Sequence, residues 1–424
     1  MRAIVNELSH KISVFAIAGL AKIRHSLHCT DMAFFSSSRT YLDWAAAAPV
    51  LPEAQRAFVQ ADRVFGNPSA PHAEGRAARD LLQIARVAIA RLAEVKPEAV
   101  VFTSGATEAN NLAIQGTVRA LRAAGRTGVL HALYLPTAHA SVIDTLTALE
   151  GEGVQAEPLA LENGAVSFTA LQRQLRPETF LVCIDAVCGE TGTRYDTRAV
   201  RRVLDAARQA GNERIALHVD ASQLPLAESF EQTRLAADFI TLDAQKVGGV
   251  RGIGALIRRF DIPLAPLLHG GGQEQGVRSG TEPVALAAAF AVALEVCAEN
   301  RIPFVKRARA MRARLIATLR AALPDLLINE GKEGVSHILN VSIPGRDTEY
   351  AAVLLDTEGF AVSTKSACET DAAEGSRVVL ALTGDPTRAA STLRISWGPT
   401  TKPRDLDRFA AALLRTIRFL DTDS

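Results

Sequence analysis

Short apolar runs recur along residues 41–301, and segments long enough to form helices separate them. Strands that alternate with helices in this way form βαβ units, in which the strands lie mostly parallel in one sheet. Because ligands bind beyond the carboxyl ends of such strands, the small and polar residues just after each run are the candidates for function. The runs span residues 99–103, 130–135, 180–184, 215–219 and 239–242.

The length of 424 residues suits two domains better than one. Residues 285–323 have the pattern of a long helix, which Pro303 should kink or divide because proline lacks an N–H and its ring clashes with the preceding turn. We place the domain junction at this proline. Residues 39–303 would then form a large domain and residues 304–424 a smaller α+β domain. Strand-like runs of the smaller part span residues 337–343 and 393–397.

The charges of the chain nearly cancel, with 47 Lys and Arg residues against 46 Asp and Glu residues. This balance provides no overall field that would attract nucleic acid or an anionic membrane surface, and it favours a small-molecule substrate. The apolar residues at 12–21 are too few to span a bilayer, which requires about 20 residues as a helix. We expect residues 1–38 to be a poorly ordered targeting leader or the result of a start site assigned upstream of Met32.

The five cysteines are scattered and odd in number. This distribution argues against a disulfide framework and favours a reducing compartment such as the cytoplasm. Cys183 and Cys188 lie on one predicted strand and its exit loop, and we expect them to be buried rather than to bind a metal. We predict no metal site.

Two strand ends carry side chains that suit one cofactor. Asp220 follows the run at 215–219, and Asp243-Ala-Gln-Lys246 with a glycine-rich stretch follows the run at 239–242. Taken singly, Asp220 would cap a helix and Lys246 would be a surface lysine. Together they meet the needs of pyridoxal phosphate (PLP), which requires a lysine for a Schiff base and a carboxylate that keeps the pyridine nitrogen protonated. We therefore predict that Lys246 carries PLP.

A third segment supplies a candidate phosphate site. The run at 99–103 leads into Ser104-Gly-Ala-Thr-Glu-Ala-Asn110, a turn of small residues followed by a helix start. Helix N-termini bind phosphate through their free N–H groups and their dipole. The pattern is weak by itself, because Ser104 or Thr107 would serve equally as a helix cap.

A series of motifs in one order carries a family resemblance from about Tyr41 to the end of the chain. The motifs lie at residues 41–49, 65–69, 103–111, 218–223, 252–256, 269–272, 278–281, 366–368 and 394–396. In them the chain resembles the cysteine desulfurases, the NifS/IscS-like members of the class V aminotransferase family. The resemblance implies the fold type I of PLP-dependent transferases, with a mostly parallel seven-stranded sheet in the large domain. It also implies that residues 39–54 pack on the small domain.

The resemblance implies roles for individual residues. Lys246 would form the Schiff base and move protons, and Arg394 would bind the substrate carboxylate with its planar guanidinium. His139 would stack on the cofactor ring. The other implied cofactor contacts are Asp220 to the pyridine nitrogen, Gln223 to the ring hydroxyl, Ala106, Thr107 and Gln245 toward the phosphate, and Thr281 to the phosphate from the second subunit of a homodimer.

Cys368 would be the sulfur-accepting residue. It lies in a small, polar segment that is unsuited to burying an inert cysteine. In the family this thiol attacks the sulfur of cysteine, keeps it as a persulfide and releases alanine. The persulfide then travels to an acceptor protein, either an iron–sulfur scaffold or a sulfur carrier for thio-cofactors and tRNA. Such transfer requires a thiolate on a mobile loop in the small domain.

Four positions in three segments near the expected cofactor depart from the family pattern. Asp243 and Gln245 stand where a serine and a histidine usually bind the phosphate, Gly189 replaces an asparagine, and Ala138 replaces a glutamate. A carboxylate repels a phosphate dianion, so we expect Asp243 to turn away or to be neutralised, with Arg251 as its candidate partner. Each lost hydrogen bond to a charged group costs about 1.5–3 kcal/mol.

Two other functions compete with cysteine desulfuration. One is a related PLP enzyme with an altered substrate, such as an aminotransferase, a lyase or a selenocysteine lyase. The other is a catalytically silent homologue that retains the dimer fold for assembly. Dependence of turnover on Cys368 separates the first from desulfuration, and absence of bound PLP identifies the second.

Overall fold

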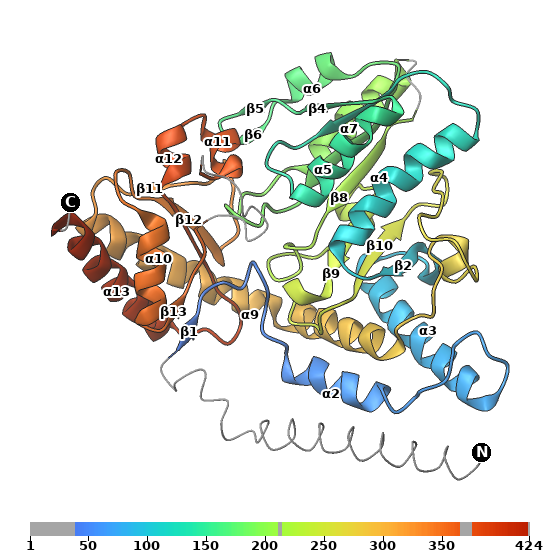
Figure 1. Cartoon of the computed structure of the whole chain (residues 1–424), viewed down its shortest axis with the longest axis horizontal. Helices are drawn as coiled ribbons and strands as arrows, with labels where there is room; N and C mark the ends of the chain where they lie inside the picture. The colour runs from blue at the N-terminus through green and yellow to red at the C-terminus, as the bar shows by residue number, and fades with distance from the viewer. Residues whose placement is uncertain (1–38, 211–213, 365–374, 423–424) are drawn as a thin grey trace, which may run out of the picture.

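The computed structural model describes residues 39–210, 214–364 and 375–422. Residues 1–38, including the expected leader, and residues 365–374, including Cys368, lie outside the described part of the chain. Figure 1 shows two lobes, a larger one built around one sheet and a smaller one that contains the C-terminal helices.

A seven-stranded sheet forms the centre of the larger lobe (Figure 1). Its order is β2-β10-β9-β8-β7-β3-β4, and within this sheet only β10 runs antiparallel to its neighbours. The predicted mostly parallel α/β fold is therefore confirmed. The strands are β2 (Val100–Thr103), β3 (Leu130–Tyr134), β4 (Val154–Pro158), β7 (Thr179–Asp185), β8 (Ala216–Asp220), β9 (Phe239–Asp243) and β10 (Gly254–Arg258).

The five predicted strands are present with shifts of about one residue at their ends. They were recognisable because β2, β7, β8 and β9 are buried along their whole length and are therefore mostly apolar. The sequence did not reveal β4 or β10. The edge strand β4 alternates polar and apolar residues, and β10 directly follows a stretch rich in glycine.

Helices cover the sheet and connect the two lobes. Figure 1 shows α2, α3 and α9 side by side, and α9 contacts both of its neighbours as well as α13 of the smaller lobe. The helices of the larger lobe include α2 (Pro52–Ala61), α3 (Ala73–Ala93), α4 (Ala106–Ala123), α5 (Ala140–Ala148), α6 (Phe168–Gln174), α7 (Thr197–Gln209), α8 (Gln232–Leu235) and α9 (Val284–Ala322).

The expected division of the long helix at Pro303 is not found. Helix α9 continues from Val284 to Ala322 with the proline inside it. Pro303 is exposed, while Cys297 before it and Phe304 after it are buried. Packing on both sides therefore holds the helix together across the missing hydrogen bond. The domain limits at residues 303 and 304 stay a prediction.

The smaller lobe contains an antiparallel sheet of order β11-β12-β14. The N-terminal strand β1 (Thr40–Tyr41) crosses to this lobe and pairs in parallel with β13 (Phe360–Ala361). The remaining α-helices and strands of the described chain are β11 (Leu327–Ile328), β12 (Ile338–Ser342), β14 (Thr392–Ser396), α10 (Thr348–Thr357), α11 (Arg377–Thr383), α12 (Pro386–Ala390), α13 (Pro403–Thr422) and the separate hairpin β5 (Leu161–Glu162) with β6 (Ala165–Val166).

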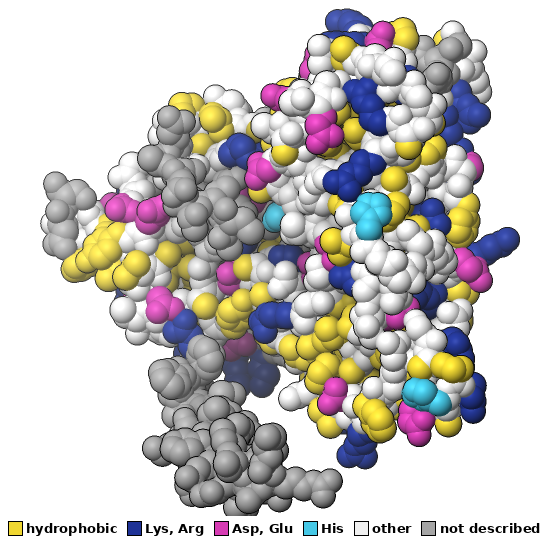
Figure 2. Space-filling view, turned by 45° about the vertical axis from the view of Figure 1, so that its right-hand side comes forward, with side chains coloured by type: hydrophobic (Ala, Val, Ile, Leu, Met, Phe, Trp, Pro, Cys, Tyr) yellow, Lys and Arg dark blue, Asp and Glu magenta, His cyan; other side chains and the backbone are white. Residues whose placement is uncertain are grey.

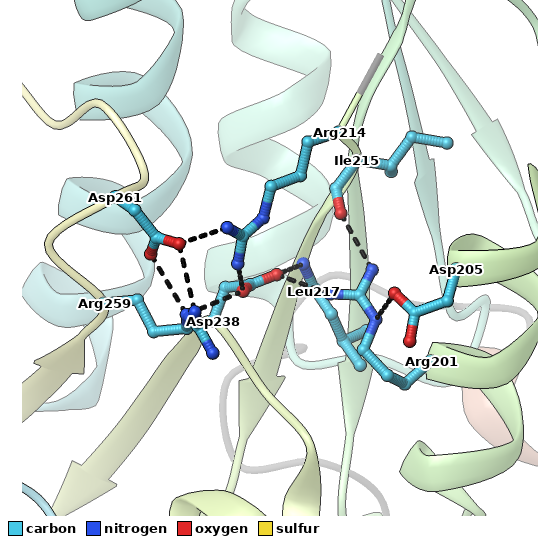
Figure 3. Close-up of polar contacts among 8 residues, drawn as sticks. All are labelled: Arg201, Asp205, Arg214, Ile215, Leu217, Asp238, Arg259 and Asp261. Atoms are coloured by element: carbon cyan, nitrogen blue, oxygen red, sulfur yellow. Dashed lines mark hydrogen bonds and ion pairs between the residues drawn. The ribbon is translucent and has the colours of Figure 1, made fainter. Parts of the chain in front are cut away.

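A buried carboxylate secures the beginnings of β8 and β9 (Figure 3). Asp238 accepts hydrogen bonds from Arg201 Nη1 at 2.8 Å, from Arg214 Nη2 at 2.6 Å and from the backbone N–H of Leu217 at 2.8 Å. Arg259 lies 3.6 Å from the same carboxylate. Because Asp238 directly precedes β9 and Leu217 belongs to β8, this cluster fixes the two strands that carry Asp220 and Asp243 at their other ends.

We expect Asp238→Ala to lower the free energy of unfolding by about 3–5 kcal/mol, because it leaves arginines without their buried anion. Asp261→Ala is the matched control, since Asp261 binds two of the same arginines but its side chain is half exposed. Its loss should cost about 0–1 kcal/mol. Chemical denaturation of the two variants measures the difference. Equal effects would show that Asp238 does not secure the strands.

Candidate active site

Three aspartates meet at the carboxyl edge of the sheet. Asp185, Asp220 and Asp243 end the adjacent strands β7, β8 and β9. Parallel register places the Cα of Asp185 opposite that of Asp220. All three are buried, and all line one cavity of about 210 Å³. Burying three acids side by side is costly unless each is hydrogen-bonded or protonated, so their partners determine what the site binds.

Most of the residues selected from the sequence line this cavity. They are Ala106, Thr107, His139, Asp220, Gln223, Gln245, Lys246 and Arg394. Thr281 is exposed and does not line it, and Cys368 lies outside the described residues. The sequence therefore identified side chains that the fold brings together from five separate segments, although their roles stay predictions.

Lys246 lies at the end of the short helix η3 (Ala244–Lys246) directly after β9. Its Nζ donates hydrogen bonds to the carbonyl oxygens of Ala45 at 2.9 Å and Ala46 at 2.7 Å. The side-chain amide of Gln223 donates to the same Ala45 carbonyl at 2.8 Å. The segment before α2 thus covers the cavity and holds the amine near Gln223.

Asp220 and His139 belong to one hydrogen-bond network. Asn110 donates through Nδ2 to Asp220 Oδ2 at 2.8 Å and to Ser141 Oγ at 2.9 Å. Ser141 Oγ lies 2.8 Å from His139 Nδ1, and Ser222 N donates to the other oxygen of Asp220 at 2.9 Å. Burial lowers the pKa of His139 more than the nearby Asp220 raises it, which favours a neutral imidazole. The ring is nevertheless accessible from the cavity.

Sequence reasoning did not assign roles to Asn110, Ser141 or Ser222. Asn110 lies on α4 one turn after Ala106, so helical spacing from the predicted phosphate site was the available signal. Ser141 and Ser222 follow His139 and Asp220 by two residues. That short spacing is typical of side chains that hydrogen-bond in turns, but it gives no indication of their common partner.

Asp243 does not turn away from the phosphate site, contrary to one of the two expectations. Its Oδ2 accepts from the Ala106 N–H at 3.1 Å and its Oδ1 from the Gln245 N–H at 3.0 Å. Arg251 is exposed and forms no described bond to it. Burial raises the pKa of Asp243. The raised pKa therefore favours neutralisation of the Asp243 charge by protonation of its own carboxylate rather than by an ion pair with Arg251.

Asp185 was not selected from the sequence. Its Oδ1 is buried and has no hydrogen-bond partner in the described part of the chain. Burial, and secondly the negative charge of Asp220, raise the pKa of Asp185 well above its ordinary value. This favours a neutral carboxylic acid beside Asp220.

Arg394 lies on β14 and reaches the cavity from the smaller lobe. Its Nη2 is 2.8 Å from Asp43 Oδ1, and its Nη1 donates to the Gly189 carbonyl at 3.2 Å. A second guanidinium in the cavity wall, that of Arg377, donates to the Pro136 and Ala138 carbonyls at 2.5 and 2.9 Å. The sequence analysis did not identify Arg377, whose helix α11 follows the undescribed residues 365–374.

The missing side chain at Gly189 leaves little free space. A Cβ at this position would lie 3.1 Å from Gln223 Nε2, closer than an ordinary van der Waals contact. Gln223 therefore occupies the space that the usual asparagine would need.

Cys183 and Cys188 are buried as expected, and burial raises the pKa of the Cys188 thiol to about 11. A thiol with that pKa stays protonated and unreactive near neutral pH.

The cavity fits the ring of PLP better than its phosphate. At one side an amine, a carboxylate, a neutral imidazole and an amide converge, which is the set that a pyridine aldehyde requires. At the other side the first residues of α4, Ala106 and Thr107, line the cavity, but Asp243 already accepts the N–H of Ala106. No group of three or more metal-ligating side chains, and no helix long and apolar enough to cross a membrane, occurs among the described residues.

Comparison with known proteins agrees with this geometry. Residues 40–409 match the family Aminotransferase class-V. The cysteine desulfurase IscS of Serratia proteamaculans is 35% identical over 374 residues, which cover 87% of this chain and 90% of that protein. IscS of Vibrio vulnificus is 34% identical over 390 residues, or 89% of this chain and 94% of that protein.

Solved structures of similar fold cover nearly the same region. A NifS-like protein superposes with a TM-score of 0.83 at 27% identity and covers 90% of this chain and all of its own. SspA in complex with cysteine has a TM-score of 0.72 at 29% identity, with 85% of this chain and 99% of SspA covered. The chain therefore belongs to the class V aminotransferase family, among its NifS/IscS-like members.

Proposed function

We propose that the protein is a PLP-dependent cysteine desulfurase, which converts L-cysteine into L-alanine and holds the released sulfur as a persulfide on Cys368. The observation that carries this proposal is the convergence of Lys246, Asp220 and Arg394 on one cavity. The printed names of the IscS relatives and the cysteine complex of SspA support the choice of substrate.

PLP, when bound, supplies an electron sink for negative charge that develops at the α-carbon of an amino acid. Lys246 would hold the cofactor covalently and move the α-proton, because its amine lies at the strand end beside Gln223. Asp220 would keep the pyridine nitrogen protonated, and the Asn110 and Ser222 hydrogen bonds hold its carboxylate in place. His139 would cover one face of the ring as a neutral imidazole.

Arg394 would bind the substrate carboxylate in place of Asp43. The two side chains form an ion pair at 2.8 Å, and Arg394 is almost completely buried. A carboxylate that enters the cavity can therefore replace one anionic partner by another without leaving the guanidinium unpaired. Because Asp43 precedes the alanines that bind Lys246, substrate entry and the position of the lysine would be linked.

Sulfur transfer would use the thiolate of Cys368. It attacks the sulfur of the substrate, a new S–S bond forms as the C–S bond breaks, and the electron pair of that bond goes to the substrate carbon. Protonation of this carbon completes alanine, and Cys368 retains the sulfur as a persulfide. A sulfur-acceptor protein, such as an iron–sulfur scaffold or a sulfur carrier, would then receive it.

A related PLP enzyme with another amino-acid substrate is the second candidate. The observation that favours it is the pair Asp185 and Arg377, a buried acid and a second guanidinium in the same cavity wall. These groups would alter which side chains the site accepts.

We further propose a homodimer in the cytoplasm. Thr281 is exposed and absent from the cavity of its own chain, which supports a contact with the phosphate bound to another subunit. The described cysteines Cys183, Cys188 and Cys297 are free thiols, which supports a reducing compartment. Figure 2 shows positive and negative side chains interspersed over the visible face, a distribution that suits a small-molecule substrate.

Replacing Cys368 by alanine should abolish sulfur transfer while the visible absorbance of bound PLP is retained. The physical reason is that the thiol acts on the substrate after the cofactor is bound. Alanine and sulfide formed from L-cysteine in the presence of reductant measure the activity, with Cys297→Ala as the control because Cys297 is a buried cysteine on α9. Unchanged turnover in Cys368→Ala would favour the second candidate, and absence of PLP absorbance in the wild type would indicate a silent homologue.

A hybrid dimer tests the contribution of Thr281. One subunit carries Lys246→Ala and the other carries Thr281→Ala, each with its own affinity tag. If Thr281 acts across the interface, the subunit that retains Lys246 receives an intact Thr281 from its partner and binds PLP with wild-type affinity. The Thr281→Ala homodimer should bind PLP about tenfold or more weakly, through loss of a hydrogen bond to a charged group. Equal weakness of hybrid and homodimer would contradict the arrangement.

Asp185 should make the stability of the cofactor-free protein depend on pH. Its pKa in the folded state lies well above the ordinary 3.8, so the folded protein binds more protons than the unfolded chain. Stability is then lost as the pH rises above 3.8 toward the raised pKa. Relative to Asp185→Asn, the wild type should therefore become progressively less stable from acid to neutral pH. Asp196→Asn, at an exposed cap, is the control; a pH-independent difference for Asp185→Asn would refute the assignment.

A further inference from the structure

Two acidic side chains with different partners lie at the start of α4, Glu108 within its first turn and Asp243 beside Ala106. Glu108, in the first turn of α4, forms an ion pair with Arg278 at 2.8 Å and accepts from the Ser104 N–H. Asp243 accepts hydrogen bonds from the Ala106 and Gln245 N–H groups, and among the described residues it forms no ion pair. An anion that binds at the start of α4 therefore lies near Glu108, whose charge Arg278 balances, and near Asp243, which has backbone donors but no ion-pair partner among the described residues.

The backbone fixes Asp243 in this position. In the ladder β2-β10-β9, Gly254 is the partner of both Thr103 and Asp243. A Cβ on Gly254 would lie 2.6 Å from the carbonyl carbon of Gly105, so the turn before α4 packs directly on β10. The turn and the end of β9 cannot separate without breaking the sheet. Rotation of the Asp243 side chain is the remaining way to release the Ala106 N–H.

The groups that face Asp243 do not cancel its charge in full. Burial, the largest effect, and Asp220 of β8 favour the protonated form of Asp243, whereas the Ala106 and Gln245 N–H groups and, more weakly, Lys246 of η3 favour the ionised form. His139, at the start of α5, has a lowered pKa and so contributes little positive charge near neutral pH. From α4, the facing groups are the uncharged Ala106 and Thr107. The net result is a raised pKa for Asp243.

We propose that Asp243 determines how strongly the cofactor site prefers a ligand that carries a phosphate group. The ionised Asp243 side chain repels the phosphate of PLP, and the protonated side chain allows the phosphate to bind. This inference rests on the proposed function, because PLP is the ligand. It assigns to Asp243 a specificity role toward the charge of the cofactor. Two consequences follow: PLP affinity rises as the pH falls, and the advantage of PLP over unphosphorylated pyridoxal is small at alkaline pH.

The test compares cofactor-free wild type with Asp243→Asn, which retains an oxygen for the Ala106 N–H but carries no charge. PLP and pyridoxal are titrated separately, and dissociation constants are taken from the visible absorbance of the bound cofactor. At about pH 8.5 the variant should bind PLP about tenfold or more tightly than the wild type, and this difference should become smaller as the pH is lowered and Asp243 is protonated. Pyridoxal affinity should change by less than about twofold, because it has no phosphate to repel.

Two further variants secure the interpretation. Asp243→Ser removes the charge with a smaller side chain and should behave as Asp243→Asn, so a folding defect in one variant does not decide the result. Asp196→Asn removes one charge from the N-terminus of α7, where Asp196 accepts from the Ala199 N–H at 2.9 Å, and should leave both affinities unchanged. The phosphate of PLP itself titrates in the same way in both measurements, so its effect cancels when the PLP affinities of wild type and variant are compared at one pH.

The outcomes separate the inference from the proposed function. Equal PLP affinity in wild type and both Asp243 variants would overturn the inference and leave the PLP enzyme intact. Equal tightening of PLP and pyridoxal would also overturn it, since the charge would not then act through the phosphate. Failure of every protein to bind either compound would overturn the inference together with the proposed function. Binding of PLP by the Asp243 variants, but weakly or not at all by the wild type at alkaline pH, would support it.

Discussion

The parallel register of β7, β8 and β9 is the constraint on which the site depends. Because adjacent strands end at the same edge, their terminal residues Asp185, Asp220 and Asp243 are forced into one buried region. Three neighbouring carboxylates cannot all stay ionised in a protein interior without partners. Each of the three carboxyl groups has different hydrogen-bond partners in the structure, and the parts of the cavity around them therefore differ chemically.

Asp220 has two hydrogen-bond donors, and one of them, Asn110, connects it through Ser141 to His139. Asp185 has an oxygen without a hydrogen-bond partner among the described residues, and Asp243 accepts from two backbone N–H groups. Raised pKa values favour protonation of the latter two. This supports the proposal that Asp220 alone pairs with the pyridine nitrogen, while the other two carboxyl groups would modify what the cavity accepts around the ring.

The N-terminal segment joins the two lobes at the cavity. Strand β1 pairs with β13 of the smaller lobe, and the residues after it supply Asp43 to Arg394 and the Ala45 and Ala46 carbonyls to Lys246. A short stretch of chain therefore contacts both the group that would hold the cofactor and the group that would hold the substrate. Movement of the smaller lobe would reach Lys246 through this segment.

The sequence by itself determined the mostly parallel sheet and eight of the residues that line the cavity. Buried strands such as β7 and β8 are continuous apolar runs, and the residues after them, including Asp220 and Lys246, are the ones that a parallel sheet gathers at one edge. Only the tertiary structure decided how these groups are partnered. Contacts between segments distant in the chain determine that Asn110 binds both Asp220 and Ser141 and that Asp243 binds the Ala106 N–H. Such contacts also place Gln223 in the space that an asparagine at position 189 would need. They hold α9 continuous through Pro303. Hydrogen-bond partners and pKa values follow from such distances and from burial, which local sequence patterns do not contain.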